Sequence, residues 1–281
     1  MLDPWVGLLG LAMVLATGAP ARSIDPGPSP VCPADMRLVE GVHHEHVTHL
    51  CLDELPEVLP AGRLANRKKG RAKDLHCFHY AEDLSILEGE ATPIRVCMDQ
   101  FEAPNRRGAR PLVMQSYRSA EGWCAKAGKR VCAEREWELA CEGPNHLPLN
   151  YGWAVNTKLC NSNKGWRAVD FAKFGASLED ARREAEKLWQ GSPSGHYRSC
   201  VSAFGIHDMN GNVEEWVTSR SGRPWPGALM GGFWAKPWTG CRGTNDAHEP
   251  TFVFYETGFR CCKEPSDAKA TQDAEPSDAK R

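Results

Sequence analysis

The sequence predicts an irregular, loop-rich domain with few long secondary-structure elements, held together by covalent or metal cross-links. The segment 191–260 is rich in Gly, Pro and Trp, and its apolar residues follow no sustained helical or strand period. Such loops need cross-links to offset the entropy lost on ordering them. The 281-residue chain contains 12 cysteines, an even number that favours disulfides in an oxidising compartment. Its hydrophobic fraction of 41% is sufficient for a packed core.

The first 21 residues are typical of an export signal. Val6–Ala16 is an apolar run too short to span a bilayer, and the segment 19–21 offers a small-residue cleavage site. Because Asp3 is charged and no Lys or Arg precedes the run, an uncleaved anchor is the alternative. We expect a secreted or periplasmic protein, with no stable membrane span once the signal is removed.

The rest of the chain divides by composition. We expect a proline-rich linker over 22–33, an N-terminal strap with a basic loop over 34–96, the domain core over 97–263, and a disordered polar tail over 264–281. The basic run Arg63–Lys73 lacks the aromatic side chains that single-stranded nucleic-acid sites use, so we interpret it as a solvated loop, with binding of an anionic polymer as the alternative. The formal net charge is only −2, and we expect no nucleic-acid partner and a monomeric protein.

Three helices are predicted by their period and by their ends. The segment Ser119–Ala127 places the apolar residues Ala120, Trp123, Cys124 and Ala127 at i, i+3, i+4 and i+7, which predicts one apolar face, and Gly128 follows as a stop. Glu134–Cys141 has acidic residues in its first turn, which suits the helix dipole. Ser177–Leu188 begins with a capping pattern and is mostly charged, so we expect it on the surface.

The segment 204–216 (FGIHDMNGNVEEW) concentrates oxygen-bearing side chains around a glycine. The candidate ligands around Gly211 are Asp208, Asn210, Asn212, Glu214 and Glu215. Hard oxygen ligands around a tight turn suit calcium, although the spacing is not that of an EF-hand. From the residues alone, a calcium loop and a hydrogen-bonded turn are both open.

This segment resembles the signature of the formylglycine-generating enzyme family, also called sulfatase-modifying factors. Three further parts of the chain match that family's motifs in order: Cys97–Glu102, then Trp123–Glu138, then Met230–Trp234 with its continuation through Cys241 to Cys261. The resemblance covers residues 97–262. It implies an α+β domain, irregular and related to C-type lectin-like folds, with little regular secondary structure.

The resemblance also implies a calcium site and disulfides. Carried over residue by residue, the calcium ligands are the side chains of Asp208 and Glu215 and the carbonyls of Gly211 and Val213. A second calcium site would begin near Asn161 and Ser162, but the segment after it departs from the family pattern. The implied disulfides are Cys124–Cys261 and Cys141–Cys241. For the other cysteines we infer the pairs Cys160–Cys200, Cys77–Cys97, Cys32–Cys51 and Cys132–Cys262.

Enzymes of this family use copper(I) and oxygen, and they need two thiols after the Gly-Gly turn. The corresponding stretch here, 235–240, contains no cysteine, and Cys241 aligns with a structural cysteine. We therefore do not expect copper. The sequence predicts a calcium-stabilised binding or accessory module that recognises a peptide, a protein or a small polar ligand. The alternative is an oxidoreductase of the same superfamily that acts on a protein or a small thiol substrate.

Two polar clusters are candidate sites. His44 and His46 share a face if their segment is a strand, so iron or zinc held by imidazoles is one hypothesis, and an exposed polar strap is the other. A second cluster follows Cys241 on a segment that we expect to line a groove. Its members are Arg242, Asn245, Asp246 and His248.

Overall fold

The computed structural model describes residues 29–54, 77–237 and 239–266. The expected export signal, most of the proline-rich linker, the basic run Arg63–Lys73 and nearly all of the polar tail lie outside these residues. Within the described part of the chain, no helix combines the length and the apolar composition needed to cross a bilayer.

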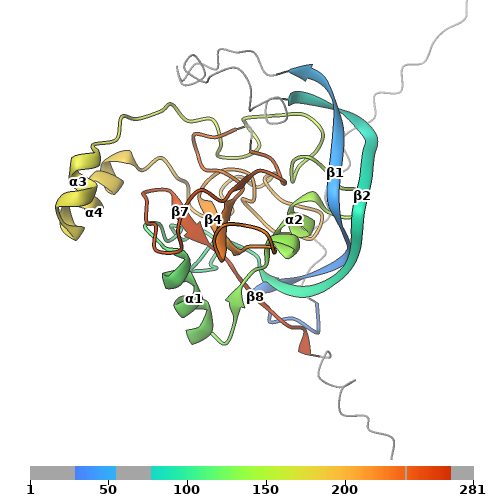
Figure 1. Ribbon diagram of the computed structural model, residues 1–281, viewed down its shortest axis with the longest axis horizontal. Coiled ribbons are helices and arrows are strands. Elements are labelled where there is room, and N and C mark those ends of the chain that lie inside the picture. The colour runs from blue at the N-terminus through green and yellow to red at the C-terminus, as the bar shows by residue number, and fades with distance from the viewer. Residues whose placement is uncertain (1–28, 55–76, 238, 267–281) are drawn as a thin grey trace, which may run out of the picture.

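A long antiparallel hairpin forms one side of the molecule. Strand β1 (Met36–Glu54) pairs with β2 (Cys77–Asp99) along its whole length, with several bulges, and the pair curves around the domain (Figure 1). The short strands β8 (Cys261–Lys263) and β3 (Arg130–Val131) complete a sheet with the order β1-β2-β8-β3. The interpretation of the histidine segment as an exposed polar strap is correct only in part. Val42, His46, Thr48 and Leu50 are exposed, whereas His43 is completely buried and contacts Glu138 of helix α2 (Glu134–Glu142).

A second sheet of four short strands lies in the centre of the domain (Figure 1). Its order is β6-β5-β4-β7. The strands are β4 (Glu214–Thr218), β5 (Gly227–Met230), β6 (Thr244–Asn245) and β7 (Thr257–Phe259). Strand β4 follows the glycine turn of the signature segment directly and runs parallel to β7. Loops connect most of these strands, as the composition of 191–260 predicts.

The three expected helices are present. Helix α1 (Tyr117–Lys126) starts two residues before its expected position, because the Ser116 hydroxyl accepts the Ser119 amide hydrogen and caps it. Its buried stripe is Tyr117, Ala120 and Cys124, so the expectation that Trp123 belongs to the apolar face is wrong, and that side chain is 44% exposed.

Helices α2 (Glu134–Glu142) and α4 (Leu178–Leu188) match their expected ranges closely. The Ser177 hydroxyl accepts the Asp180 amide hydrogen and caps α4. A short helix, α3 (Phe171–Ala176), precedes it and has no counterpart in the predictions. In Figure 1, α3 and α4 lie on the side of the domain opposite the hairpin.

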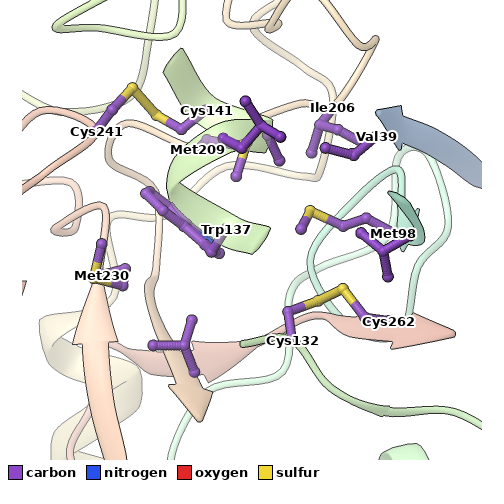
Figure 2. Close-up of a cluster of buried hydrophobic side chains, with 14 of the residues drawn as sticks. Val39, Met98, Cys132, Trp137, Cys141, Ile206, Met209, Met230, Cys241 and Cys262 are labelled. Atoms are coloured by element: carbon purple, nitrogen blue, oxygen red, sulfur yellow. A yellow bond between two sulfur atoms is a disulfide. The ribbon is translucent and has the colours of Figure 1, made fainter. Parts of the chain in front are cut away.

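The main core is built around Trp137 of α2. Figure 2 shows its indole between the Cys141–Cys241 and Cys132–Cys262 disulfides, with Met209 and Met230 nearby. All of these side chains are at most 1% exposed. Two disulfides thus contribute directly to the packed interior as well as cross-linking the chain.

All twelve cysteines are paired in six disulfides. The structure contains the Cys124–Cys261 and Cys141–Cys241 bridges that the family resemblance implies. It also contains the inferred Cys132–Cys262 and Cys160–Cys200 bridges.

The other two inferred pairs are wrong. The structure joins Cys32 to Cys97 and Cys51 to Cys77. The hairpin register explains the exchange, because it places Cys51 and Cys77 at one end of the strands and brings Cys97 to the end where the chain enters β1.

We expect the buried bridges to matter more for stability than the one at the end of the hairpin. Replacing Cys141 and Cys241 together with Ala opens a 100-residue loop and removes core sulfur atoms, so the free energy of unfolding should fall by about 4 kcal/mol. Replacing Cys51 and Cys77 together with Ala opens a loop of only 26 residues and removes an exposed cysteine. The resulting loss in the free energy of unfolding should be smaller by at least about 1 kcal/mol. Urea denaturation of the two double variants measures the difference, and equal losses would contradict this account.

Candidate functional site

Three glutamates one helical turn apart line one face of α2. Glu134, Glu138 and Glu142 are spaced i, i+4 and i+8, which places them on the same side of the helix. Their side chains are fully buried. Buried carboxylates are tolerated only where partners offset the loss of hydration. We call this row the glutamate ladder.

Three arginines from distant parts of the chain neutralise the glutamate ladder. Arg220 donates from Nε to Glu134 at 2.8 Å and from Nη2 to Glu138 at 2.6 Å. Arg223 donates from Nη2 to Glu134 at 2.5 Å. Arg242 donates to both oxygens of Glu142 at 2.6 and 2.8 Å. Each carboxylate is therefore matched by at least one guanidinium in a nearly water-free setting.

Histidines and the arginines complete the electrostatics of the ladder. His43 of β1 lies 2.7 Å from Glu138 through Nε2, which ties the hairpin to α2. Burial alone would raise the pKa of Glu134, but hydrogen bonds from Arg223 and Arg220 hold that pKa at about 2. Burial also opposes ionisation of Glu142, and hydrogen bonds from His146 and Arg242 lower its pKa below the usual value. The ladder is therefore ionised at neutral pH at both of its ends.

A groove of about 480 Å³ opens beside the ladder. Its lining comes from β1, from the loop 220–223, and from Glu138 and Arg242. The lining residues are Glu45, His46, Val47, Thr48, Glu138, Arg220, Ser221, Gly222, Arg223 and Arg242. The arginine side chains are 19–26% exposed, whereas the ladder carboxylates beneath them are not exposed. A ligand entering this arginine groove therefore meets guanidinium groups first.

Only part of the predicted groove residues lines this cavity. Arg242 does, and Asp246 lies at its margin, where it accepts a hydrogen bond from Arg223 Nη1 at 3.0 Å. Asn245 is in β6, and the ring of His248 stacks on Phe252 with 3.7 Å between centroids. The predictions missed the glutamate ladder, although the i, i+4, i+8 spacing of its acids was visible in the sequence.

Neutralising the middle of the ladder should destabilise the fold. Glu138→Gln removes a buried charge that contacts His43, Arg220 and Arg242, so we expect a loss of about 3 kcal/mol in the free energy of unfolding. The matched control is Glu121→Gln, which removes an exposed pair with Arg118 and should change stability by no more than about 0.5 kcal/mol. Chemical denaturation checks both, and similar effects in the two variants would show that the ladder is not a structural element.

A second buried polar cluster lies under the signature segment. It consists of the carboxylates of Glu102, Asp208 and Glu215, with Arg260 as the fully buried cation among them. Arg260 donates from Nε and Nη2 to the two oxygens of Glu215, both at 2.6 Å, and Trp137 Nε1 donates to the same carboxylate at 2.8 Å. We call Glu102, Asp208 and Glu215 the buried acid cluster.

The negative charge of the buried acid cluster exceeds what Arg260 can neutralise. Burial raises the pKa of Asp208 to about 7, and the charge of Glu215 adds to the shift. Burial, with the charges of Asp208 and Glu215, also raises the pKa of Glu102 well above its usual value. The cluster therefore opposes full ionisation at neutral pH unless another cation is present.

The expected pH dependence follows from the raised pKa of Asp208. The folded state binds this proton more tightly than the unfolded chain, so its stabilising effect is complete near pH 4 and is lost as the pH rises to about 7. Asp208→Asn can still accept the Gly195 amide hydrogen, which Asp208 accepts at 2.6 Å. In calcium-free buffer, the stability of the native protein relative to this variant should fall by up to about 1.4 kcal/mol per pH unit over that interval. Urea denaturation at several pH values measures it, and a pH-independent difference would refute the assignment.

The structure packs the first expected calcium site against the second, but it engages Glu215 in other contacts. Glu215 uses both carboxylate oxygens for Arg260 and Trp137, so as arranged it does not fit a calcium ligand. Gly211 packs directly against the second expected site, since a Cβ built on it would lie 2.5 Å from the Asn161 carbonyl oxygen and 2.8 Å from Ser162. The buried Asn161 Oδ1 has no hydrogen-bond partner. Val213 is buried in the core beside these groups.

The two candidate metal-binding histidines, His44 and His46, lie in different surroundings and differ in solvent exposure. The half-buried His44 makes an edge contact with the His146 ring at 5.2 Å between centroids, whereas His46 is exposed at the arginine groove. Among the described residues, no three His, Cys, Asp or Glu side chains converge to hold a metal ion.

These features define a class of domain: an irregular α+β fold with two small sheets, a tryptophan-centred core and six disulfides. The chain belongs to the sulfatase-modifying factor family, because the family model for the sulfatase-modifying factor enzyme 1-like domain matches residues 83–265, more than half of its length.

Curated relatives are similar over part of the chain. Hercynine oxygenase of Mycolicibacterium smegmatis is 33% identical over 43% of this chain and 24% of its own length. Formylglycine-generating enzyme of Mycobacterium tuberculosis is 30% identical over 40% of this chain and 34% of its own. Inactive C-alpha-formylglycine-generating enzyme 2 of Bos taurus is 32% identical over 39% of this chain and 33% of its own length. The matches thus span about a quarter to a third of these relatives.

Among solved structures, PvdO from Pseudomonas aeruginosa is similar, with a TM-score of 0.43 and 16% sequence identity over 80% of this chain and 94% of its own. CarF gives a TM-score of 0.45 with 11% identity over 78% of this chain and 98% of its own.

Proposed function

We propose that this protein is an exported binding or accessory module of the sulfatase-modifying factor family that does not generate formylglycine. The observation that carries the proposal is the state of its cysteines, since all twelve are bonded in pairs. Copper(I) chemistry of the kind the family resemblance implies requires soft thiolate ligands. Cys241, the cysteine nearest to the expected catalytic stretch, is fully buried and bonded to Cys141.

The arginine groove supports a binding role. It is concave, it is open to solvent, and its walls come from β1, the loop 220–223 and Arg242. Its volume of about 480 Å³ is within the usual range for small-ligand and peptide sites, roughly 300–1,000 Å³. A peptide, a protein segment or a small polar ligand could be held there by guanidinium groups and backbone atoms. The six disulfides support export, because they persist in oxidising compartments.

The alternative function is oxidation of a protein or small thiol substrate with other residues. The names of two relatives, an oxygenase and a formylglycine-generating enzyme, favour it. The name of the third, an inactive member, favours the binding role. The bonded state of Cys141 and Cys241 decides our preference for the binding role.

The proposal predicts a negative result in a direct assay. A CxPxR peptide incubated with the protein, copper(I) and oxygen should keep its cysteine, because no thiolate is free to hold the metal. Mass spectrometry of the peptide reads the outcome, and an active formylglycine-generating enzyme serves as the positive control. Loss of the mass that formylglycine formation requires would overturn the proposal.

We also propose that calcium stabilises the fold. Its ligands would differ from the full set that the resemblance implies, because Glu215 is not among them. The unpartnered oxygen Asn161 Oδ1 and the excess charge at Asp208 fit a hard cation, whereas Glu215 is already neutralised by Arg260. A bound calcium would supply charge neutralisation and tie the segment around Asn161 to the Gly211 turn. It would take no part in a reaction.

Calcium should therefore raise the melting temperature of protein that has been treated with a chelator. At saturating calcium we expect an increase of roughly 5 °C, and little change with magnesium, which accepts such sites poorly. Asn161→Ala should remove most of the increase, whereas Asn145→Ala, at an exposed turn, should keep it. No calcium effect on the native protein would remove calcium from the proposal.

A further inference from the structure

A second cavity, of about 400 Å³, opens beside α1 and shares no residue with the arginine groove. Its volume is within the usual range for small-ligand sites, roughly 300–1,000 Å³. The Cys124–Cys261 bridge fastens α1 to β8 at this place (Figure 1). The lining residues are Asp35, Asp99, Ala103, Pro104, Asn105, Trp123, Lys126, Ala127, Lys129 and Cys261. We call this the Trp123 cavity.

The indole of Trp123 gives the cavity an apolar wall. This side chain is 44% exposed, and Ala103 and Pro104 line the same cavity. An edge contact with the buried ring of Phe259, with 6.3 Å between centroids, holds the indole in place. An aromatic ring that faces solvent in a cavity gains free energy when an apolar surface covers it. This wall therefore favours a ligand that has an apolar face.

A fixed polar network forms another part of the lining. Lys129 Nζ donates to Asp99 Oδ1 at 2.6 Å and to Asp35 Oδ2 at 3.1 Å. Asn105 Nδ2 donates to the same two carboxylate oxygens, at 3.0 and 2.9 Å. Asp99 Oδ2 accepts the amide hydrogen of Cys261 at 3.1 Å. These bonds hold the polar groups in position before any ligand enters.

The network leaves hydrogen-bonding capacity for a ligand. An ammonium group has three donors, and the two bonds to Asp35 and Asp99 leave one donor of Lys129. The side chain of Asp35 is 52% exposed, and a carboxylate has about four acceptor positions. Among the described residues, the ammonium of Lys126, in the last turn of α1, has no hydrogen-bond or ion-pair partner. Donors and an acceptor are therefore both available.

The charges of the lining cancel, because Asp35 and Asp99 are matched by Lys126 and Lys129. Burial opposes the ionisation of Asp35, but the hydrogen bond and the charge of Lys129 lower its pKa below the usual value. An anionic ligand would meet the Asp35 carboxylate, and a cationic ligand would meet the Lys126 ammonium. The lining therefore favours a neutral ligand whose polar groups both donate and accept hydrogen bonds.

We propose that the Trp123 cavity binds a neutral sugar in its pyranose form. One face of such a ring carries axial C–H groups, and this face covers the indole of Trp123. The hydroxyl groups at the edge of the ring donate to Asp35 and accept from Lys126 and Lys129. This mode of binding uses side chains alone. It involves none of the residues of the arginine groove, so the inference goes beyond the proposed function.

The test adds methyl β-glucopyranoside to the intact protein and follows the indole N–H signals by NMR. The Trp123 signal, identified by its absence in Trp123→Phe, should shift in a saturable way with a dissociation constant of about 1 mM. Sorbitol, an open-chain polyol without a rigid apolar face, should leave this signal unchanged. Glucosides that carry a carboxylate or an ammonium group should bind no more tightly than the neutral sugar.

Protein variants test the two parts of the lining, with saturation transfer to the sugar as the measure of binding. Trp123→Ala should weaken binding at least tenfold, whereas Trp123→Phe keeps an aromatic wall and should retain most of it. The matched control is Trp225→Ala, because Trp225 is 40% exposed and does not line the cavity. Lys126→Gln should weaken binding about threefold and leave the melting temperature unchanged, because this ammonium makes no bond within the described part of the chain.

Three results would overturn the inference. The first is no shift of the Trp123 signal, and the second is equal binding to the native protein and to folded Trp123→Ala. The third is binding of a charged glucoside, or of N-acetyltyrosine amide, at least about tenfold tighter than that of the neutral sugar, which would assign the cavity to an ionic ligand or to a peptide. Formylglycine formation on a CxPxR peptide would refute the proposed function without affecting sugar binding, so the two failures are distinguishable.

Discussion

The bond between Cys141 and Cys241 fixes the geometry on which the candidate site depends. Cys141 is followed by Glu142 at the end of α2, and Cys241 is followed by Arg242, so this bridge brings that carboxylate and that guanidinium together. Arg242 then reaches Glu138 and the His44 carbonyl. A single buried cross-link thus aligns α2, the hairpin and one wall of the arginine groove. The same bridge uses the cysteine that stands nearest to the expected catalytic stretch.

The two buried charge clusters, the glutamate ladder and the buried acid cluster, differ in their ratio of carboxylates to arginines. In the glutamate ladder, arginines match the carboxylates, and the pKa of Glu134 is held at about 2. In the buried acid cluster, Arg260 is committed to Glu215, and the pKa of Asp208 is raised to about 7. The first arrangement supports a permanent structure. The second leaves an excess of negative charge. A calcium ion would neutralise this charge, and protonation neutralises it when no calcium is bound.

The elements that depend on local sequence patterns could be predicted from the sequence. The helices follow from period and capping, as at Ser177, and the family motifs place the signature segment before β4. The hairpin was not predicted, because the histidines of β1 make a half-buried strand look polar in sequence. The inner face of that strand packs on α2, where His43 is buried. The pairs of Cys51 and Cys97 depend on strand register, which spacing along the chain does not reveal. The ladder was missed for a similar reason, because the arginine partners lie about 80–100 residues further along the chain.

Every cysteine of this protein serves the structure, and none is free for chemistry. Alkylating the purified, unreduced protein under denaturing conditions and mapping its peptides by mass spectrometry tests this most directly. We expect no alkylated cysteine, with a cross-linked peptide for Cys141–Cys241 among the six bridges. Alkylation of Cys141 or Cys241, or a partner other than each other, would contradict it.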